Sequence, residues 1–331
     1  MKVLKLNNMS RPGTVFFILL VFFLFVFSAF RFEVGTDYNH YVMLFNYLGE
    51  GNEHWGRIEP GFQILVKSIY IFTDNPRFLF FLFSLVTIVF FVIGWVRFSP
   101  SVIVSLIVFF GLYHYFNSLN VSRQYVAMSV YFLFATRGLI DKRPVYYFLS
   151  CFIASLFHLT AILMTVLYPF LVRRWSTYVY LLIYSLFIFI YLAYDYVSGF
   201  VFSSLGFYSG YLSYKEGSAN ILFITCLFMF GISWFYKSKI FKYGEIGVVA
   251  FNFSFLSVCI IPFSNYNIMF SRVAMYFSVY FAIVIPILLF CIKSKKERSV
   301  LFLMFLIVLV FNVFFHLYNN VGGVFPYSIS L

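Results

Sequence analysis

The stretch FLFFLFSLVTIVFFVIGWV, residues 78–96, decides the fold class. It runs for 19 residues without a charge and is dominated by Phe, Val, Leu and Ile. A helix of about 20 apolar residues crosses the hydrocarbon core of a bilayer. Because a run of this length and composition is typical of a membrane-spanning helix, the sequence indicates an integral membrane protein.

The composition of the whole chain has the same character. Of its 331 residues, 63% are hydrophobic and 10% are charged, whereas a soluble domain is about half apolar and about a quarter charged. Phe contributes 51 residues and Tyr 27, which suits lipid-facing helices and aromatic belts at the membrane interface. Little remains for a soluble domain, so we predict one integral membrane domain over residues 1–331.

Eleven apolar runs are candidate spans, and we predict an all-α polytopic protein with about eleven transmembrane helices (ten to twelve). The runs are Val15–Phe30, Phe78–Val96, Val102–Phe116, Val121–Thr136, Val145–Phe157, Leu159–Val172, Tyr178–Tyr194, Ala219–Tyr236, Ile246–Phe263, Val273–Ile292 and Val300–Leu317. The segment Pro60–Phe72 is too short and too amphipathic to span, so it is predicted to be a re-entrant or interfacial helix.

The basic residues set the orientation of these spans. With the N-terminus inside, strict alternation places 16 of the 23 Lys and Arg residues on the inner side, but only 3 of the 11 Asp and Glu residues. Lys and Arg concentrate on the side from which loops are not exported. The formal charge of +12 is therefore a topology signal and not a nucleic-acid footprint. The main outer loops are residues 31–77 and 197–218, and the C-terminus is also outside.

One part of the topology depends on this charge argument. Pro144–Val172 resembles a single long span, yet both of its flanks are basic and should lie inside. Two short spans in place of one return the chain to the inner side, and they place His158 at the outer tip between them. The alternative role for His158 is a packing histidine between the two arms.

The informative polar residues then share the outer face. Arginines at outer helix ends oppose the positive-inside bias, and near carboxylates they indicate a pocket for an anionic group such as a phosphate. Aromatic loop residues suit sugar binding. The candidates are Arg31, Arg123 and Arg272 as anion contacts, Asp37, Glu59 and His158 as catalytic groups, and Tyr38, Tyr41, Gln124 and Tyr276 as positioning residues.

Each candidate also has a plainer explanation. Arg31 and Arg123 can reach toward lipid phosphates, Asp37 can cap the helix that follows it, and Glu59 before Pro60 suits the start of a helix. The histidines and cysteines lack metal-ligand spacing, and no nucleotide-binding or hydrolase motif occurs. We therefore predict no metal, no cofactor and no nucleic-acid partner.

These residues also form a recognisable series. The opening Arg31-x-Glu33-x-Gly35-x-Asp37-Tyr38-x-x-Tyr41 resembles the signature of EpsG-type polysaccharide polymerases, relatives of the bacterial Wzy-type O-antigen polymerases. Further matching elements follow in the same order along nearly the whole chain. They are Glu59-Pro60-Gly61-Phe62, Ser122-Arg123-Gln124, Ala154-Ser155-Leu156-Phe157-His158-x-Thr160-Ala161, Ser271-Arg272 with Tyr276, and Phe325-Pro326-Tyr327. Leu159-Thr160 stands where the family often has Ser directly after the histidine.

The resemblance implies a membrane-embedded, GT-C-like glycosyltransferase of the bacterial inner membrane, with a cytoplasmic N-terminus and a periplasmic C-terminus. Such polymerases join oligosaccharide units carried on undecaprenyl diphosphate at the periplasmic face and need no nucleotide sugar. Both donor and acceptor are lipid-linked, and a separate chain-length regulator is an expected partner. In this role Asp37 is the expected base, with Glu59 and His158 as rivals, and the three arginines neutralise the leaving diphosphate.

Two other functions stay open at this point. An O-antigen ligase moves finished polymer from the same lipid carrier, but such ligases have a large late periplasmic loop, whereas here the first outer loop is larger. A flippase or transporter carries ionisable residues in mid-membrane, whereas the charges here cluster at the ends of spans.

Overall fold

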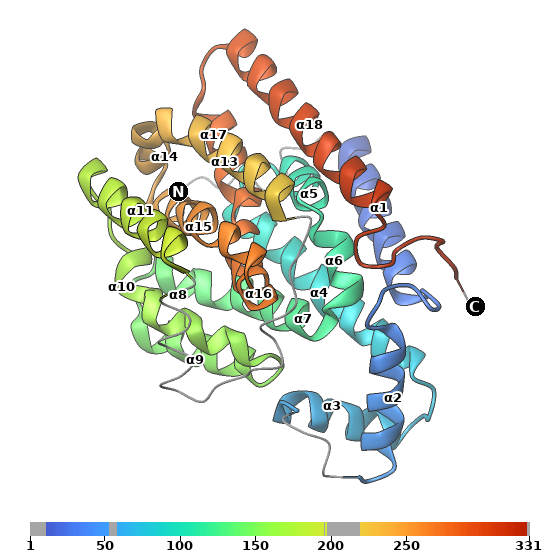
Figure 1. The fold of residues 1–331 in the computed structure, drawn as a ribbon. Helices are drawn as coiled ribbons and strands as arrows, with labels where there is room; N and C mark the ends of the chain where they lie inside the picture. The colour runs from blue at the N-terminus through green and yellow to red at the C-terminus, as the bar shows by residue number, and fades with distance from the viewer. Residues whose placement is uncertain (1–10, 53–57, 195, 197–218, 330–331) are drawn as a thin grey trace. The chain divides into compact units, whose positions relative to one another are not determined.

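In the computed structural model, residues 11–52, 58–194, 196 and 219–329 are described, and they form helices joined mostly by short turns (Figure 1). Within these ranges the only strand-like feature is an isolated antiparallel bridge between Arg31 and Ile329. The predicted all-α class is confirmed. The predicted outer loop 197–218 lies outside the described residues.

The chain divides into two compact units. Unit 1 consists of Met1–Pro169 and Val313–Leu331, and unit 2 of Phe170–Asn312. The helices of unit 1 are α1 (Arg11–Ala29), α2 (Tyr38–Gly49), α3 (Pro60–Tyr70), α4 (Arg77–Phe98), α5 (Val102–Gly111), α6 (His114–Asn120), α7 (Ser122–Val130), η2 (Tyr131–Ala135), α8 (Thr136–Ile140), α9 (Pro144–Ser155) and η3 (Leu159–Leu167). The short α10 (Tyr168–Leu171) and the long α18 (Lys295–Tyr318) each run across a unit boundary. The single membrane domain over residues 1–331 stays a prediction.

The helix α4, formed by the stretch that decided the fold class, is the centre of unit 1. It packs against α1, α3, α5 and α7. Its inward side chains include Phe80, Phe83, Phe91 and Trp95, all nearly inaccessible to solvent. Phe78, Leu85 and Val89 remain exposed on its other side, so α4 buries one side in unit 1 and leaves an apolar side uncovered.

A left-handed residue breaks one predicted span. Val102–Phe116 is expected to be one helix, but α5 and α6 meet at a bend of 59°. Tyr113, between them, has φ +66°, which costs an L-residue roughly 1–2 kcal/mol. Its hydroxyl donates to the Val321 carbonyl oxygen at 3.0 Å, and its ring lies beside His316. These contacts with a distant part of the chain offset the strain.

The hairpin predicted from charge parity is present. The helix α9 ends at Ser155, the chain turns through Leu156–His158, and the 3₁₀ segment η3 then packs against α9. His158 therefore occupies the connection between two short helical segments, as predicted.

The last described residues close onto the loop after α1. The terminal segment, residues 319–329, accepts backbone hydrogen bonds from Phe32, Gly35 and Thr36 at 3.0–3.1 Å. Asn120 at the end of α6 binds the same loop, because its Oδ1 accepts from the Thr36 backbone N–H at 2.7 Å. The conformation of residues 31–36 is thus fixed by two segments that are remote in sequence.

Unit 2 is organised around α15 (Glu245–Ile260), whose residues are almost all buried. It packs against the other helices of the unit. They are α11 (Thr177–Leu192), α13 (Ala219–Phe235), α14 (Lys237–Tyr243), η5 (Ile261–Asn265), α16 (Ile268–Ser278) and α17 (Phe281–Cys291). Asn252 of α15 is fully buried, and its amide donates to the Arg173 carbonyl oxygen at 2.9 Å while its Oδ1 accepts from the Tyr180 hydroxyl.

The structure supports a membrane protein but a smaller number of clear spans. Each of the eleven predicted runs coincides with one or more helices. Four helical stretches among the described residues are long and apolar enough to cross a membrane, and the number rises to six if each of two bent pairs is one span. The predicted interfacial segment forms α3, which packs against α2 and α4.

Candidate functional site

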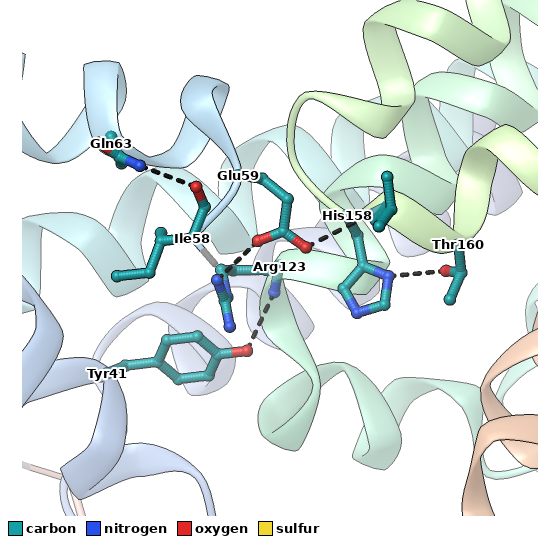
Figure 2. A network of polar contacts seen from close by, with 8 residues as sticks. Tyr41, Ile58, Glu59, Gln63, Arg123, His158 and Thr160 are labelled. Atoms are coloured by element: carbon teal, nitrogen blue, oxygen red, sulfur yellow. Dashed lines mark hydrogen bonds and ion pairs between the residues drawn. The ribbon is translucent and has the colours of Figure 1, made fainter. Parts of the chain in front are cut away.

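The start of α3 brings a carboxylate to two other helix ends of unit 1. Glu59 is the residue immediately before α3, and its side chain makes no capping bond to that helix. Its Oε2 instead accepts from Arg123 Nη1 at 2.9 Å, and its Oε1 accepts from the Leu159 backbone N–H at 3.2 Å (Figure 2). One carboxylate therefore links three separate helix ends, those of α3, α7 and η3.

Arg123 is held in a fixed orientation by this carboxylate and by two rings. Its guanidinium lies 4.9 Å from the centroid of Phe62 and 5.8 Å from that of Tyr41. The side chains of Arg123 and Glu59 are 19% and 15% exposed. The charges of a pair sheltered to this degree are screened less by salt and water than those of a surface pair. The Nε of Arg123 is buried without a hydrogen-bond partner among the described residues.

His158 stands beside this ion pair, since Leu159, the next residue, donates to Glu59. Its Nδ1 lies 2.6 Å from Thr160 Oγ1, and this hydrogen bond fixes the plane of the ring (Figure 2). Thr160, two residues after the histidine, thus supplies the hydroxyl that bonds the ring. An oriented, half-buried imidazole is suited to proton transfer near neutral pH.

Tyr41 connects this cluster to α2. Its hydroxyl accepts from the Arg123 backbone N–H at 3.2 Å. Burial raises the pKa of the Tyr41 hydroxyl, and the nearby Arg123 charge opposes that shift. The hydroxyl is therefore protonated at neutral pH and can also donate. We call Tyr41, Glu59, Arg123 and His158 the polar cluster.

Asp37 and Tyr38 lie one helical turn before Tyr41. Tyr38 is buried and stacks on Phe80 with ring centroids 4.5 Å apart. Asp37 is the residue before α2 but makes no capping bond, so the capping role considered for it is not observed. Its half-buried carboxylate has no hydrogen-bond or ion-pair partner in the described part of the chain. Such a carboxylate is free to meet a ligand.

Arg31 lies inside unit 1 rather than at its surface. It is 2% exposed, and it donates to the Ser28 carbonyl oxygen at 2.8 Å and to Ser122 Oγ at 3.0 Å. Burial lowers the pKa of its guanidinium to about 10, so it stays charged at neutral pH. The structure thus excludes the lipid-facing alternative for Arg31 and shows a buried cation beside the start of α7.

Three other candidates occupy different surroundings. Gln124 is fully buried, with its Nε2 3.7 Å from Met128 Sδ in the core of unit 1. Arg272 and Tyr276 belong to α16 of unit 2, one turn apart; Arg272 is half-buried and Tyr276 is buried. Asn267 caps that helix by accepting from the Met269 backbone N–H at 2.8 Å.

Sequence reasoning missed two members of this site. Phe62 supplies the face on which the Arg123 guanidinium lies, and Thr160 orients His158. Both stood inside quoted motifs, directly after Gly61 and two residues after the histidine, and that position was the available signal. Among the described residues, no group of three His, Cys, Asp or Glu side chains could hold a metal ion.

Gly61 provides the first testable consequence of this geometry. Its backbone N–H donates to the Leu156 carbonyl oxygen at 2.8 Å, and a Cβ at this position would lie 2.7 Å from that oxygen. We expect Gly61→Ala to push α3 away from the Leu156–His158 turn and to separate Glu59 from Leu159. The activity of the protein should fall about tenfold, as expected when a functional group is misplaced by a fraction of an ångström.

The matched control is Gly231→Ala, because a Cβ at Gly231 meets nothing within 4 Å. That variant should keep full activity and expression. Equal activity of both variants, at equal amounts in the membrane, would contradict the positioning role of Gly61.

One comparison with known proteins gave a match, and it covers nearly the whole chain. The model of the EpsG family matches residues 14–329. No curated protein and no solved structure matches the chain. The family match covers both units and includes every candidate residue named above.

Proposed function

Because the chain belongs to the EpsG family, a family of polysaccharide biosynthesis membrane proteins, we propose that it is a bacterial polysaccharide polymerase. It joins oligosaccharide repeat units carried on undecaprenyl diphosphate by glycosyl transfer on the periplasmic face of the inner membrane. In this proposal the chain has a GT-C-like architecture with about eleven spans, a cytoplasmic N-terminus and a periplasmic C-terminus.

The observation that carries the proposal is the convergence of a cation, a carboxylate and an imidazole in unit 1, with a second carboxylate one helical turn from Tyr41. Arg123 is oriented by Glu59, and His158 is oriented beside them. Asp37 lies one turn from Tyr41, which contacts Arg123. Glycosyl transfer from a diphosphate needs both a proton acceptor and a positive charge for the departing group.

In the proposed reaction a new glycosidic bond replaces the bond between the growing chain and its lipid diphosphate. An acceptor hydroxyl at the nonreducing end of one lipid-linked unit attacks the anomeric carbon of the growing chain. The bond from that carbon to the diphosphate oxygen breaks, and undecaprenyl diphosphate leaves with the electron pair. Asp37, whose carboxylate has no partner among the described residues, accepts the hydroxyl proton, and Arg123 stabilises the negative charge that develops on the diphosphate.

The other candidate residues have supporting roles in this proposal. Glu59 holds Arg123 in place, and Tyr41 and Tyr38 position the sugars or the lipid phosphate. In unit 2, Arg272 and Tyr276 are proposed to contact an anionic group. The buried Arg31 charge contributes to the positive potential at the start of α7. The remaining alternatives for the base are Glu59, whose two oxygens are engaged, and His158.

The test is a deletion strain complemented with Asp37→Asn. We expect the amide, which cannot accept the proton, to reduce the polymer ladder at least 100-fold, the range seen when a general base is removed. Surface glycan is analysed by electrophoresis, and membrane levels of each protein are measured in parallel. Lipid cores capped by a single repeat unit should remain.

The matched control is Asp74→Asn, an exposed acidic residue in the same outer loop, which should restore the full ladder. A full ladder from Asp37→Asn at normal membrane levels would rule out Asp37 as the base. Complete loss of capped cores in the deletion strain would point instead to flipping or ligation, and the polymerase proposal would fall.

A further inference from the structure

Unit 2 contains a cavity that the proposed chemistry does not use. Its volume is about 220 Å³, and it lies between the end of α11, the start of α13 and the segment from α15 into η5. In the predicted topology all three of these helix ends face outward. We infer that this cavity binds a single sugar ring of the polysaccharide, an inference that rests on the proposed function.

The lining combines aromatic faces with amides. Tyr184, Phe187 and Tyr191 come from α11, Phe223 comes from α13, and Phe263 comes from η5. Tyr191 and Phe263 meet edge to face, with centroids 5.5 Å apart. Ring faces of this kind stack on the apolar faces of pyranoses, and such lining gives a sugar both contact area and a defined orientation.

Two amides supply hydrogen bonds at one edge of the cavity. Asn265 Nδ2 donates to Asn220 Oδ1 at 2.8 Å, which fixes both side chains. Asn220 Nδ2 then keeps its two N–H donors, and Asn265 Oδ1 keeps its acceptor capacity. Donors and an acceptor that are held a few ångströms apart match neighbouring hydroxyls of a sugar ring.

Hydroxyl groups extend this polar lining. Tyr184 and Tyr191 both line the cavity, and neither hydroxyl has a hydrogen-bond partner in the described ranges. A ligand with several hydroxyls can satisfy these groups, whereas a hydrocarbon chain would leave them unpaired. These polar groups, at the edge of an otherwise apolar lining, favour a saccharide over a polyprenyl tail.

The size of the cavity limits the ligand in the same direction. Pockets for drug-sized ligands measure about 300–1,000 Å³, so 220 Å³ is too small for a whole repeat unit. Val258 and Cys259 form an apolar base. The cavity is thus suited to one ring at the end or within a glycan whose other residues extend beyond it.

The test measures binding rather than polymer formation. The probe is the free repeat-unit oligosaccharide, released by mild acid from the host's own polysaccharide, and the protein is the full chain in nanodiscs. Saturation-transfer NMR and thermophoresis report the dissociation constant. The Asn220→Ala/Asn265→Ala variant should bind about tenfold more weakly, and Tyr191→Phe, which removes one hydroxyl, about threefold more weakly.

The matched control is Asn319→Ala, since this exposed amide lies directly after α18 and donates to the Phe315 carbonyl oxygen of that helix. It should bind as the wild type does. Unchanged affinity of the double variant and of Tyr191→Phe would overturn the proposal. So would displacement of the oligosaccharide by undecaprenyl phosphate combined with full binding by the amide variant, because that pair of results indicates a lipid site.

A further variant separates this inference from the proposed function. Asp37→Asn should bind the oligosaccharide normally while failing to make polymer, which supports the cavity as a separate subsite. If wild type makes no polymer but its binding depends on the two amides, the sugar site stands and the polymerase proposal fails.

Discussion

A protein in which Arg123 is replaced by methionine should reach the membrane at normal levels and lose polymer formation by about 10²–10³-fold. Removing one preorganised group that stabilises developing charge has an effect of this size. The methylene stem is retained, so the contact with Phe62 largely persists and only the charge is lost. The ladder of the complemented deletion strain and the rate of extension in purified membranes are the measurements.

A double variant separates chemistry from structure. If Arg123 only balances the charge of Glu59, then Glu59→Gln should restore activity to the Arg123→Met protein. If Arg123 contacts the diphosphate, the double variant should stay inactive, whereas Glu59→Gln alone should lower activity about tenfold through loss of orientation.

The matched control for Arg123→Met is Arg137→Met. Arg137 also pairs with a carboxylate, that of Asp141 at 2.7 Å, but its side chain is 58% exposed. Such exposed pairs contribute little, so this variant should behave as the wild type does. Equal loss in both variants would show that the effect of Arg123→Met is general and not one of the site.

The second large effect is expected on stability. Gly322 has φ +81°, and a Cβ there would lie 2.2 Å from Asn120 Nδ2. We expect Gly322→Ala to destabilise the protein by about 3 kcal/mol. The left-handed backbone contributes roughly 1–2 kcal/mol, and displacement of Asn120 from Thr36 contributes about 1 kcal/mol more. Thermal unfolding in detergent, followed by fluorescence-detected gel filtration, measures the difference.

The chain offers a control that isolates the backbone contribution. Gly51 has φ +86°, but its Cβ position meets nothing within 4 Å. Gly51→Ala should therefore show only the conformational part of the penalty. Equal unfolding temperatures for the two alanine variants would mean that contact with Asn120 contributes nothing.

The helices were predictable because lipid-facing composition is a local property, and each apolar run coincides with helix. The hairpin at His158 followed from charge parity, which needs no contact information. The break at Tyr113 was not predictable, since its left-handed backbone is offset by Val321, 208 residues away. The burial of Arg31 depends on Ser122, 91 residues away, and nothing near Arg31 in the sequence signals it.

The sequence was enough to predict which residues belong to the candidate site and that they share the outer face. It was not enough to predict which of these residues contact one another. Arg123 and Glu59 were both named, yet their ion pair joins residues 64 positions apart. Thr160 was within a quoted motif, but only the turn geometry brings its hydroxyl to His158. Asp37 was considered as a cap, and the structure leaves its carboxylate uncommitted to the backbone.

The closing of the terminal segment onto residues 31–36 has a consequence for biosynthesis. The ribosome makes the loop after α1 early, but the residues that hold it, 320–328, follow the whole of unit 2. During most of translation, this loop, which directly precedes Asp37, therefore lacks the hydrogen bonds that it later donates to the terminal segment. Premature termination before residue 320 would release a protein with nearly all its helices and with Asn120, but without the hydrogen bonds from the terminal segment to this loop.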